Sequence, residues 1–279
     1  MTLAMIAWGE TWVSAKILNM FLESKELVFW RFLFTASGLI LVLFYFKLSL
    51  KISLKNLFLA TICALILTFY NISFFLGTKY GLASLGGVLV TTLTPINTFL
   101  LINLLKRKKF TFNEISALIV GVVGALIILK IWKFNLNSML LDGNLYYLYA
   151  SLLWPFLTII SSKQKNINPL VFTFYIFFLT AFFNLIYLKF HITNIFNFNS
   201  KFWINLLLLS LYGTTFATTV YFIGVKKLGS KIASSFFFLV PVSSIIFAVI
   251  FLNEKIQITL ILGGILTIFA VYKLNKQKA

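Results

Sequence analysis

Two ionisable side chains interrupt apolar stretches near the start of the chain, and each could bind or carry charge. Glu10 lies in the middle of MTLAMIAWGETWVSAKIL, where a carboxylate could bind a substrate amine or carry a proton. Its alternative role is a structural ion pair with Lys16, Arg31 or Lys79. Arg31, in FWRFLF, could bind a substrate carboxylate through its planar fork, or else reach an aqueous interface or pair with an acidic neighbour. Both residues are candidate substrate-binding groups.

Hydroxyl groups form a stripe in the segment LYGTTFATTVYF. Thr214, Thr218 and Tyr221 are spaced at i, i+4 and i+7, so they share one face of a helix. A comparable polar pattern contains Thr91 in ASLGGVLVTTLTP. Such stripes line a binding cavity, or they supply hydrogen bonds between packed helices. We include all four residues in the predicted substrate site.

Three aromatic residues and two prolines complete the predicted site. Trp8, Tyr70 and Trp154 could stack on a substrate, although aromatic residues are 18% of the chain and most of them must face lipid. Pro95 and Pro241 each remove a backbone donor within an apolar run, which suits a hinge. Simple small-residue packing is the alternative for the segments around these prolines.

The composition indicates that these residues are held within a membrane. Of 279 residues, 61% are hydrophobic and 11% charged, with a mean hydropathy of +1.00, whereas about a quarter of a soluble domain is charged. The net charge of +18 does not indicate nucleic-acid binding, because the Lys and Arg residues lie between or at the ends of apolar runs. One cysteine, Cys63, permits no disulfide within the chain, and no metal or other cofactor is predicted.

Ten apolar runs are long enough to cross a bilayer as helices, which predicts an all-α integral membrane protein with short connections. The first run lacks the basic leader of a signal peptide and is interpreted as a retained helix, short enough that the true start could lie upstream. The predicted spans are 1–18, 26–46, 56–78, 83–105, 112–131, 140–161, 169–189, 202–224, 231–252 and 256–273.

Lysine and arginine residues are distributed unequally between alternate connections. Fifteen lie on one side and nine on the other. Because cytoplasmic loops carry the excess of positive charge, the sequence predicts that both termini are cytoplasmic and that the chain spans the bacterial inner (plasma) membrane.

The chain also contains an internal repeat. A shift of 146 residues aligns Trp8 with Trp154 and Pro95 with Pro241, which in so apolar a chain are more informative than matches of Leu or Ile. Five spans are an odd number, so the second unit must enter the membrane from the opposite face. We therefore predict two inverted five-helix repeats, residues 1–133 and 140–275.

Two polar features are assigned structural roles instead. Thr111 and Glu114 have the spacing of a capping box at the start of the fifth span. Glu254 precedes the tenth span, where a carboxylate would favour the positive end of that helix.

Several motifs resemble the EamA-type ten-helix transporters of the drug/metabolite transporter superfamily. They are WGETWVSAK (8–16), FWRFLF (29–34), ASLGGVLVTTLTP (83–95) and SKIASSFFFLVPVSSIIFAVIFLNEK (230–255). The last is similar to the family's P…GE pattern, although Asn253 replaces the glycine and Lys108 replaces the acidic residue of the first repeat. The resemblance implies a permease or exporter of a small metabolite, but not a particular cargo.

The resulting hypothesis is a secondary transporter that moves an amino acid or related amine by alternating access. Its expected partners are the small-molecule substrate, protons and the lipid bilayer, with no nucleic acid. The alternatives are a non-transporting membrane scaffold and a membrane-embedded enzyme. We predict no enzymatic activity, because the single His, Cys and Asp residues are far apart in sequence. No Walker motif is present, so ATP is not expected to drive transport directly.

Overall fold

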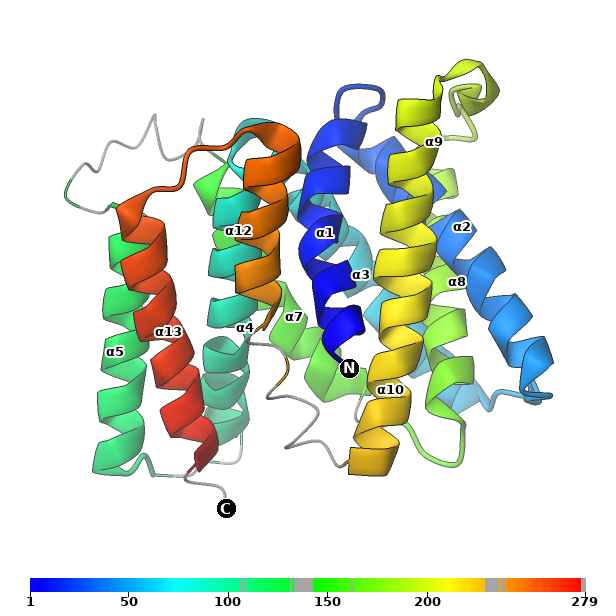
Figure 1. Ribbon diagram of the computed structural model, residues 1–279. Helices are drawn as coiled ribbons and strands as arrows, with labels where there is room; N and C mark the ends of the chain where they lie inside the picture. The colour runs from blue at the N-terminus through cyan, green and yellow to red at the C-terminus, as the bar shows by residue number, and fades with distance from the viewer. Residues whose placement is uncertain are drawn as a thin grey trace.

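The computed structural model describes residues 1–105, 107, 109–130, 132, 143–161, 163–228, 236 and 239–276. Within this part of the chain all regular structure is helical and no strand occurs (Figure 1). The helices are α1 (Thr2–Leu18), α2 (Ser24–Tyr45), α3 (Leu54–Tyr80), α4 (Ala83–Leu105), α5 (Phe112–Ile128), α7 (Asn144–Ser161), α8 (Pro169–Tyr187), α9 (Ser200–Leu207), η3 (Leu208–Phe216), α10 (Ala217–Leu228), α12 (Leu239–Leu252) and α13 (Ile258–Lys276), with a 3-10 turn, η2 (Ile195–Asn197).

Within the described part of the chain, five helical segments are long and apolar enough to cross a bilayer. They are Ser24–Tyr45, Leu54–Tyr80, Ala83–Leu105, Pro169–Tyr187 and Ser200–Tyr221. Shorter apolar helices span Phe112–Ile128, Leu239–Leu252 and Ile258–Lys273. Each of the ten predicted spans coincides with a helix within the described residues, although 131, 140–142 and all but residue 236 of 231–238 lie outside them. The chain is therefore an α-helical membrane protein.

The predicted eighth span differs in its internal geometry. α9, η3 and α10 follow one another without a break, and the nine residues of η3 form a π-helix. In a π-helix the backbone hydrogen bonds join residues that are five apart in sequence instead of four. Threonine hydroxyls in this segment likewise donate to the carbonyl five residues earlier. The Thr214 hydroxyl, for example, donates to the Leu209 carbonyl at 2.7 Å. Such segments often occur at functional sites.

Local capping signals account for where several helices begin. The predicted capping box at α5 is confirmed: the Thr111 backbone N–H donates to the Glu114 carboxylate at 2.7 Å, and the Glu114 N–H donates to the Thr111 hydroxyl at 3.3 Å. The Asn168 side chain accepts from Leu170 N–H at 2.9 Å, with Pro169 in the first turn of α8. These contacts satisfy backbone donors that lack partners within the helix.

Small residues let the helices approach closely. A Cβ atom added to Gly124 of α5 would lie 2.8 Å from the Gly263 carbonyl oxygen of α13. A Cβ atom on Gly87 of α4 would lie 2.3 Å from the Ser244 hydroxyl oxygen of α12. Lipid tails are as apolar as side chains, so no hydrophobic driving force brings helices together within a membrane. Membrane helices therefore commonly pack through small residues, which allow close van der Waals contact. This packing holds α12 against α4 and α13 against α5 (Figure 1).

Candidate functional site

A cavity of about 520 Å³ lies among the helices, and we call it the central cavity. Its lining comes from α1, α2, α3, α4, α7, α8, η3, α10, α12 and α13, with Gln164 from a connection. Ten of the eleven residues that the sequence singled out line it. They are Trp8, Arg31, Tyr70, Thr91, Pro95, Trp154, Thr214, Thr218, Tyr221 and Pro241.

Among the described residues that line the central cavity, the guanidinium of Arg31 is the charged group. Its Nη1 donates to the Asn71 side-chain oxygen at 2.8 Å, and its Nη2 donates to the Thr214 hydroxyl at 3.1 Å. Its Cζ lies 5.1 Å from the centre of the Phe74 ring and 5.6 Å from that of Phe32. Nε has no hydrogen-bond partner. The cation is thus held by neutral oxygens and aromatic faces.

No carboxylate balances this charge within the described part of the chain. The two ion pairs found there join Lys16 to Glu254 and Lys25 to Glu23, and neither reaches Arg31. No aspartate or glutamate among the described residues lines the central cavity. A buried charge without a counter-ion is costly and usually marks a functional position in a membrane protein.

Aromatic rings form much of the wall on either side. The Tyr70 and Trp154 rings, from α3 and α7, have centroids 4.8 Å apart. The Trp8 and Tyr221 rings, from α1 and α10, lie 5.4 Å apart, centroid to centroid. Both pairs are tilted, an arrangement that aromatic quadrupoles favour. The two repeat-equivalent tryptophans therefore line one cavity from two different helices.

Glu10 is not among the residues that line the central cavity. Its side chain is buried, and one carboxylate oxygen is hydrogen-bonded to the Ser14 hydroxyl while the other has no partner. Ser14 in turn lies 3.1 Å from the side-chain oxygen of Asn205. On an α-helix Glu10 is rotated by about 200° from Trp8, so the two side chains leave α1 in opposite directions. The expected ion pairs of Glu10 with Lys16, Arg31 or Lys79 do not form.

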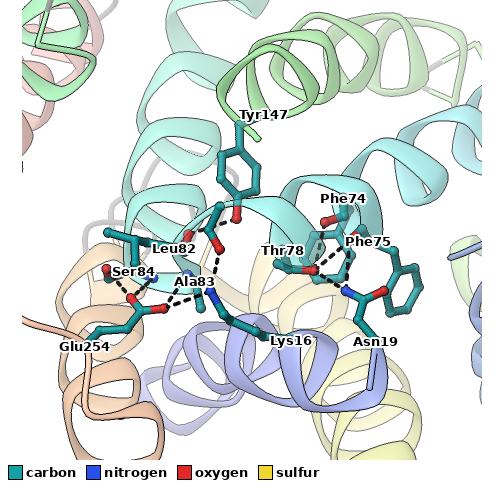
Figure 2. A network of polar contacts seen from close by, with 11 residues as sticks. Lys16, Asn19, Phe74, Phe75, Thr78, Leu82, Ala83, Ser84, Tyr147 and Glu254 are labelled. Atoms are coloured by element: carbon teal, nitrogen blue, oxygen red, sulfur yellow. Dashed lines mark hydrogen bonds and ion pairs between the residues drawn. The ribbon is translucent and has the colours of Figure 1, made fainter. Parts of the chain in front are cut away.

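Glu254 makes contacts that the sequence did not indicate (Figure 2). Its carboxylate accepts from Ala83 N–H at 2.8 Å, from Ser84 N–H at 3.1 Å and from the Ser84 hydroxyl at 2.6 Å. Its first oxygen lies 3.6 Å from Lys16 Nζ, which also donates to the Gly81 carbonyl at 2.5 Å. The expectation that Glu254 serves the start of the tenth span was wrong: it caps α4 instead. We call these five residues the latch.

The latch lies at one end of the molecule. It joins the end of α1, the connection between α3 and α4, and Glu254, which lies two residues after the end of α12. Tyr147, at the start of α7, donates its hydroxyl to the Leu82 carbonyl beside the latch at 2.8 Å (Figure 2). None of the latch residues lines the central cavity.

The opposite end carries a second, smaller cavity of about 320 Å³, which we call the lysine pocket. Its lining includes four exposed lysines, Lys51, Lys55, Lys163 and Lys165. The central cavity extends toward this end, since its lining includes Ser161, the last residue of α7, and Gln164, which lies between two of these lysines in sequence. Arg31 belongs to the opposite part of the central cavity, nearer the start of α2.

Comparison with known proteins identifies the family. The EamA-like transporter family matches residues 1–130 and 141–275. The chain belongs to this family. An uncharacterized transporter from Archaeoglobus fulgidus is 26% identical over 277 residues, covering 98% of this chain and 94% of the relative. A crystal structure covering 99% of this chain and 96% of its own has the same fold, with a TM-score of 0.69 and 15% identity.

Membership in the EamA-like transporter family makes this chain a small-molecule transporter, and the central cavity is its candidate site. Sequence reasoning missed Asn71, Phe74 and Thr11, which also line that cavity. Asn71 had a usable signal, because an amide within an apolar run needs a hydrogen-bond partner. Phe74 had none, since phenylalanine is common throughout the chain.

Proposed function

We propose that this EamA-like transporter moves an amino acid or a related metabolite through the central cavity by alternating access. The observation that carries the proposal is a cavity of about 520 Å³, lined by helices from along the whole chain, with one arginine and several aromatic rings facing it. A non-transporting scaffold would need no such cavity, because each cavity forfeits packing contacts.

The helix contacts support two inverted five-helix units, residues 1–133 and 140–275. If each helix of the first unit is exchanged for its equivalent in the second, the main helix pairs are preserved. α2 packs on α8, α4 on α12 and α5 on α13, so three helices pair with their own equivalents. α1 packs on α12 as α7 packs on α4, and α3 packs on α7 as η3 packs on α1. α1 ends near the latch whereas α7 begins there, as opposite orientation requires.

The latch and the lysine pocket support a proposed direction of access. With the latch formed, the central cavity extends toward the lysine pocket, whose positive charge suits the cytoplasmic side of a bacterial inner membrane. α1 begins and α13 ends toward this same end, which agrees with cytoplasmic termini (Figure 1). Transport then requires the latch to open, with Pro95 and Pro241 as hinges in α4 and α12.

Glu10 would act in this scheme as a proton site and not as a substrate ligand. Asn205 directs its side-chain N–H to the Lys201 carbonyl at 2.7 Å, so its oxygen faces Ser14. The single hydroxyl proton of Ser14 can then go to Asn205, and a protonated Glu10 would complete the chain by donating to Ser14. The scheme couples a proton to movement of α1 against α9.

Reconstitution tests the transport proposal directly. Purified protein in vesicles loaded with unlabelled amino acids should accumulate labelled amino acid by counterflow, and metabolite profiling of cells that overproduce the chain would select the candidates. Counterflow no greater than that of empty vesicles, across amino acids and other metabolites so selected, would favour the scaffold alternative.

A further inference from the structure

We infer that the cargo of the central cavity carries a carboxylate, which Arg31 binds at the end of the cavity farthest from the lysine pocket. The inference rests on the proposed transport function and specifies the chemical class of the cargo. It starts from the hydrogen-bonding capacity of Arg31. A guanidinium has five N–H groups. Two of them have partners within the described residues, on Asn71 and Thr214, and Nε has none.

The two partners of Arg31 position it without neutralising it. Asn71 directs its own N–H to the Leu67 carbonyl at 2.8 Å, so its oxygen must face the guanidinium. Thr214 directs its hydroxyl proton to the Leu209 carbonyl at 2.7 Å, so only its lone pair is left for Arg31. Phe74 covers the guanidinium. The fork is thus held in place with donors to spare, which suits bidentate binding of a carboxylate.

The charge balance of the cavity selects a single negative charge. Among the described residues that line it, Arg31 is the only one with a formal charge at neutral pH. One carboxylate would balance the charge of Arg31, and the ammonium group of an amino acid could then lie against the aromatic faces of the cavity. An amine without a carboxylate would add a second cation to a space that offers no anion, and a doubly charged group would leave an excess negative charge.

The walls of the cavity and the lysine pocket fit such a cargo. The aromatic pairs Tyr70–Trp154 and Trp8–Tyr221 offer apolar surface for the body of the molecule. The lysine pocket lies at the end toward which the central cavity extends, and none of its lysines has an ion-pair partner in the described chain. Topology alone explains lysines on a cytoplasmic face. They would nevertheless raise the local concentration of an anion.

Three probes that share one body and differ in charge test the inference on the full chain in detergent. These are phenylpropionate, phenylpropionamide and phenylpropylamine, whose binding is measured at neutral pH by calorimetry. Phenylpropionate should bind. The amide and the amine should bind at least tenfold more weakly, because each loses about one charge-assisted hydrogen bond to Arg31. Arg31→Gln should weaken phenylpropionate binding by about 10- to 100-fold.

Arg31→Lys should give an intermediate affinity, because it keeps the charge and loses the fork. The matched control is Arg107→Gln, which removes the other arginine of the chain from an exposed position between α4 and α5 and should bind like the wild type. If Arg31→Gln does not fold, phenylpropionate binding to the wild type is compared with binding to Arg31→Lys and to Asn71→Leu.

The inference is overturned if the amine or the amide binds as tightly as the acid, if Arg31 variants that remain folded bind the acid like the wild type, or if the acid does not bind at millimolar concentration. Because binding is measured without transport, its outcome is separate from that of the counterflow experiment. Selective binding of the acid in a protein that moves nothing would refute the proposed function alone.

Discussion

The latch makes a quantitative prediction about access to the central cavity. Glu254→Gln should favour opening of the latch end, because the amide keeps the shape of the carboxylate but presents an N–H₂ group to donors. At present one carboxylate receives two backbone N–H groups and one hydroxyl within 3.1 Å. An amide has only one acceptor oxygen for these three donors.

The magnitude follows from the contacts that are lost. One charge-assisted hydrogen bond contributes about 1.5–3 kcal/mol. The ion pair with Lys16 adds less, at most ~1 kcal/mol, because the Lys16 side chain is 26% exposed and its Nζ lies 3.6 Å from the carboxylate. If the closed state loses about 2 kcal/mol, the open population rises by about 30-fold.

Labelling of a cysteine in the central cavity would measure that change. Cys63 is the only native cysteine, so Cys63→Ala gives a background without thiols. In that background Thr11→Cys places a thiol of similar size on the cavity wall. A membrane-impermeant maleimide, added on the latch side of the membrane, should react about 30-fold faster when Glu254→Gln is also present.

The control is Glu23→Gln, which makes the same chemical change at an exposed ion pair. Its carboxylate lies 3.4 Å from Lys25 Nζ, with the two side chains 71% and 46% exposed. It should leave the labelling rate unchanged. Equal labelling rates in the Glu254→Gln variant and its parent would refute the latch, and so would an increase of the same size with Glu23→Gln.

Three further predictions concern packing, coupling and capping. Gly87→Ala should lower thermal stability in detergent by about 1–3 kcal/mol, because its Cβ would lie 2.4 Å from that of Ser244; an unchanged melting temperature would contradict the close packing of α4 on α12. Glu10→Gln should stay folded, since the amide can still donate to Ser14, and should lose the dependence of transport on an imposed proton gradient. A gradient dependence like that of the wild type would exclude Glu10 as the proton site. Thr111→Ala should cost about 1 kcal/mol in the same thermal assay, and no loss would mean that the capping box adds nothing.

The features that the sequence predicted well depend on short-range rules. Apolar runs located the helices because the bilayer demands them, and the spacing of Thr111 and Glu114 was enough to predict their capping box. The repeat drew attention to Trp8 and Trp154, and both line the central cavity. Helical periodicity also bears on the direction of the Glu10 side chain. It turns Glu10 away from Trp8, so both could not have faced the same cavity.

Contacts between distant segments could not be predicted in this way. Glu254 was assigned to the nearest helix start, but it caps one that lies 170 residues away in sequence. Arg31 binds Asn71 and Thr214, which lie 40 and 183 residues away. The π-helical segment was also missed, because the expected 3.6-residue period assumes an α-helix. Each of these depends on which helices become neighbours.

The charges of Glu254, Arg31 and Glu10 differ in how completely the protein satisfies them, and this difference separates their roles. Glu254 has three donors and a cation, so it is already fully bound and suits a closing contact. Arg31 has neutral partners for two of its five N–H groups and lines a cavity, so a ligand anion is what it lacks. Glu10 has one partner and one free oxygen away from that cavity, so a proton is the species that would complete it. Since burying unsatisfied charge in a membrane is costly, the two incomplete sites are where cargo and proton should act.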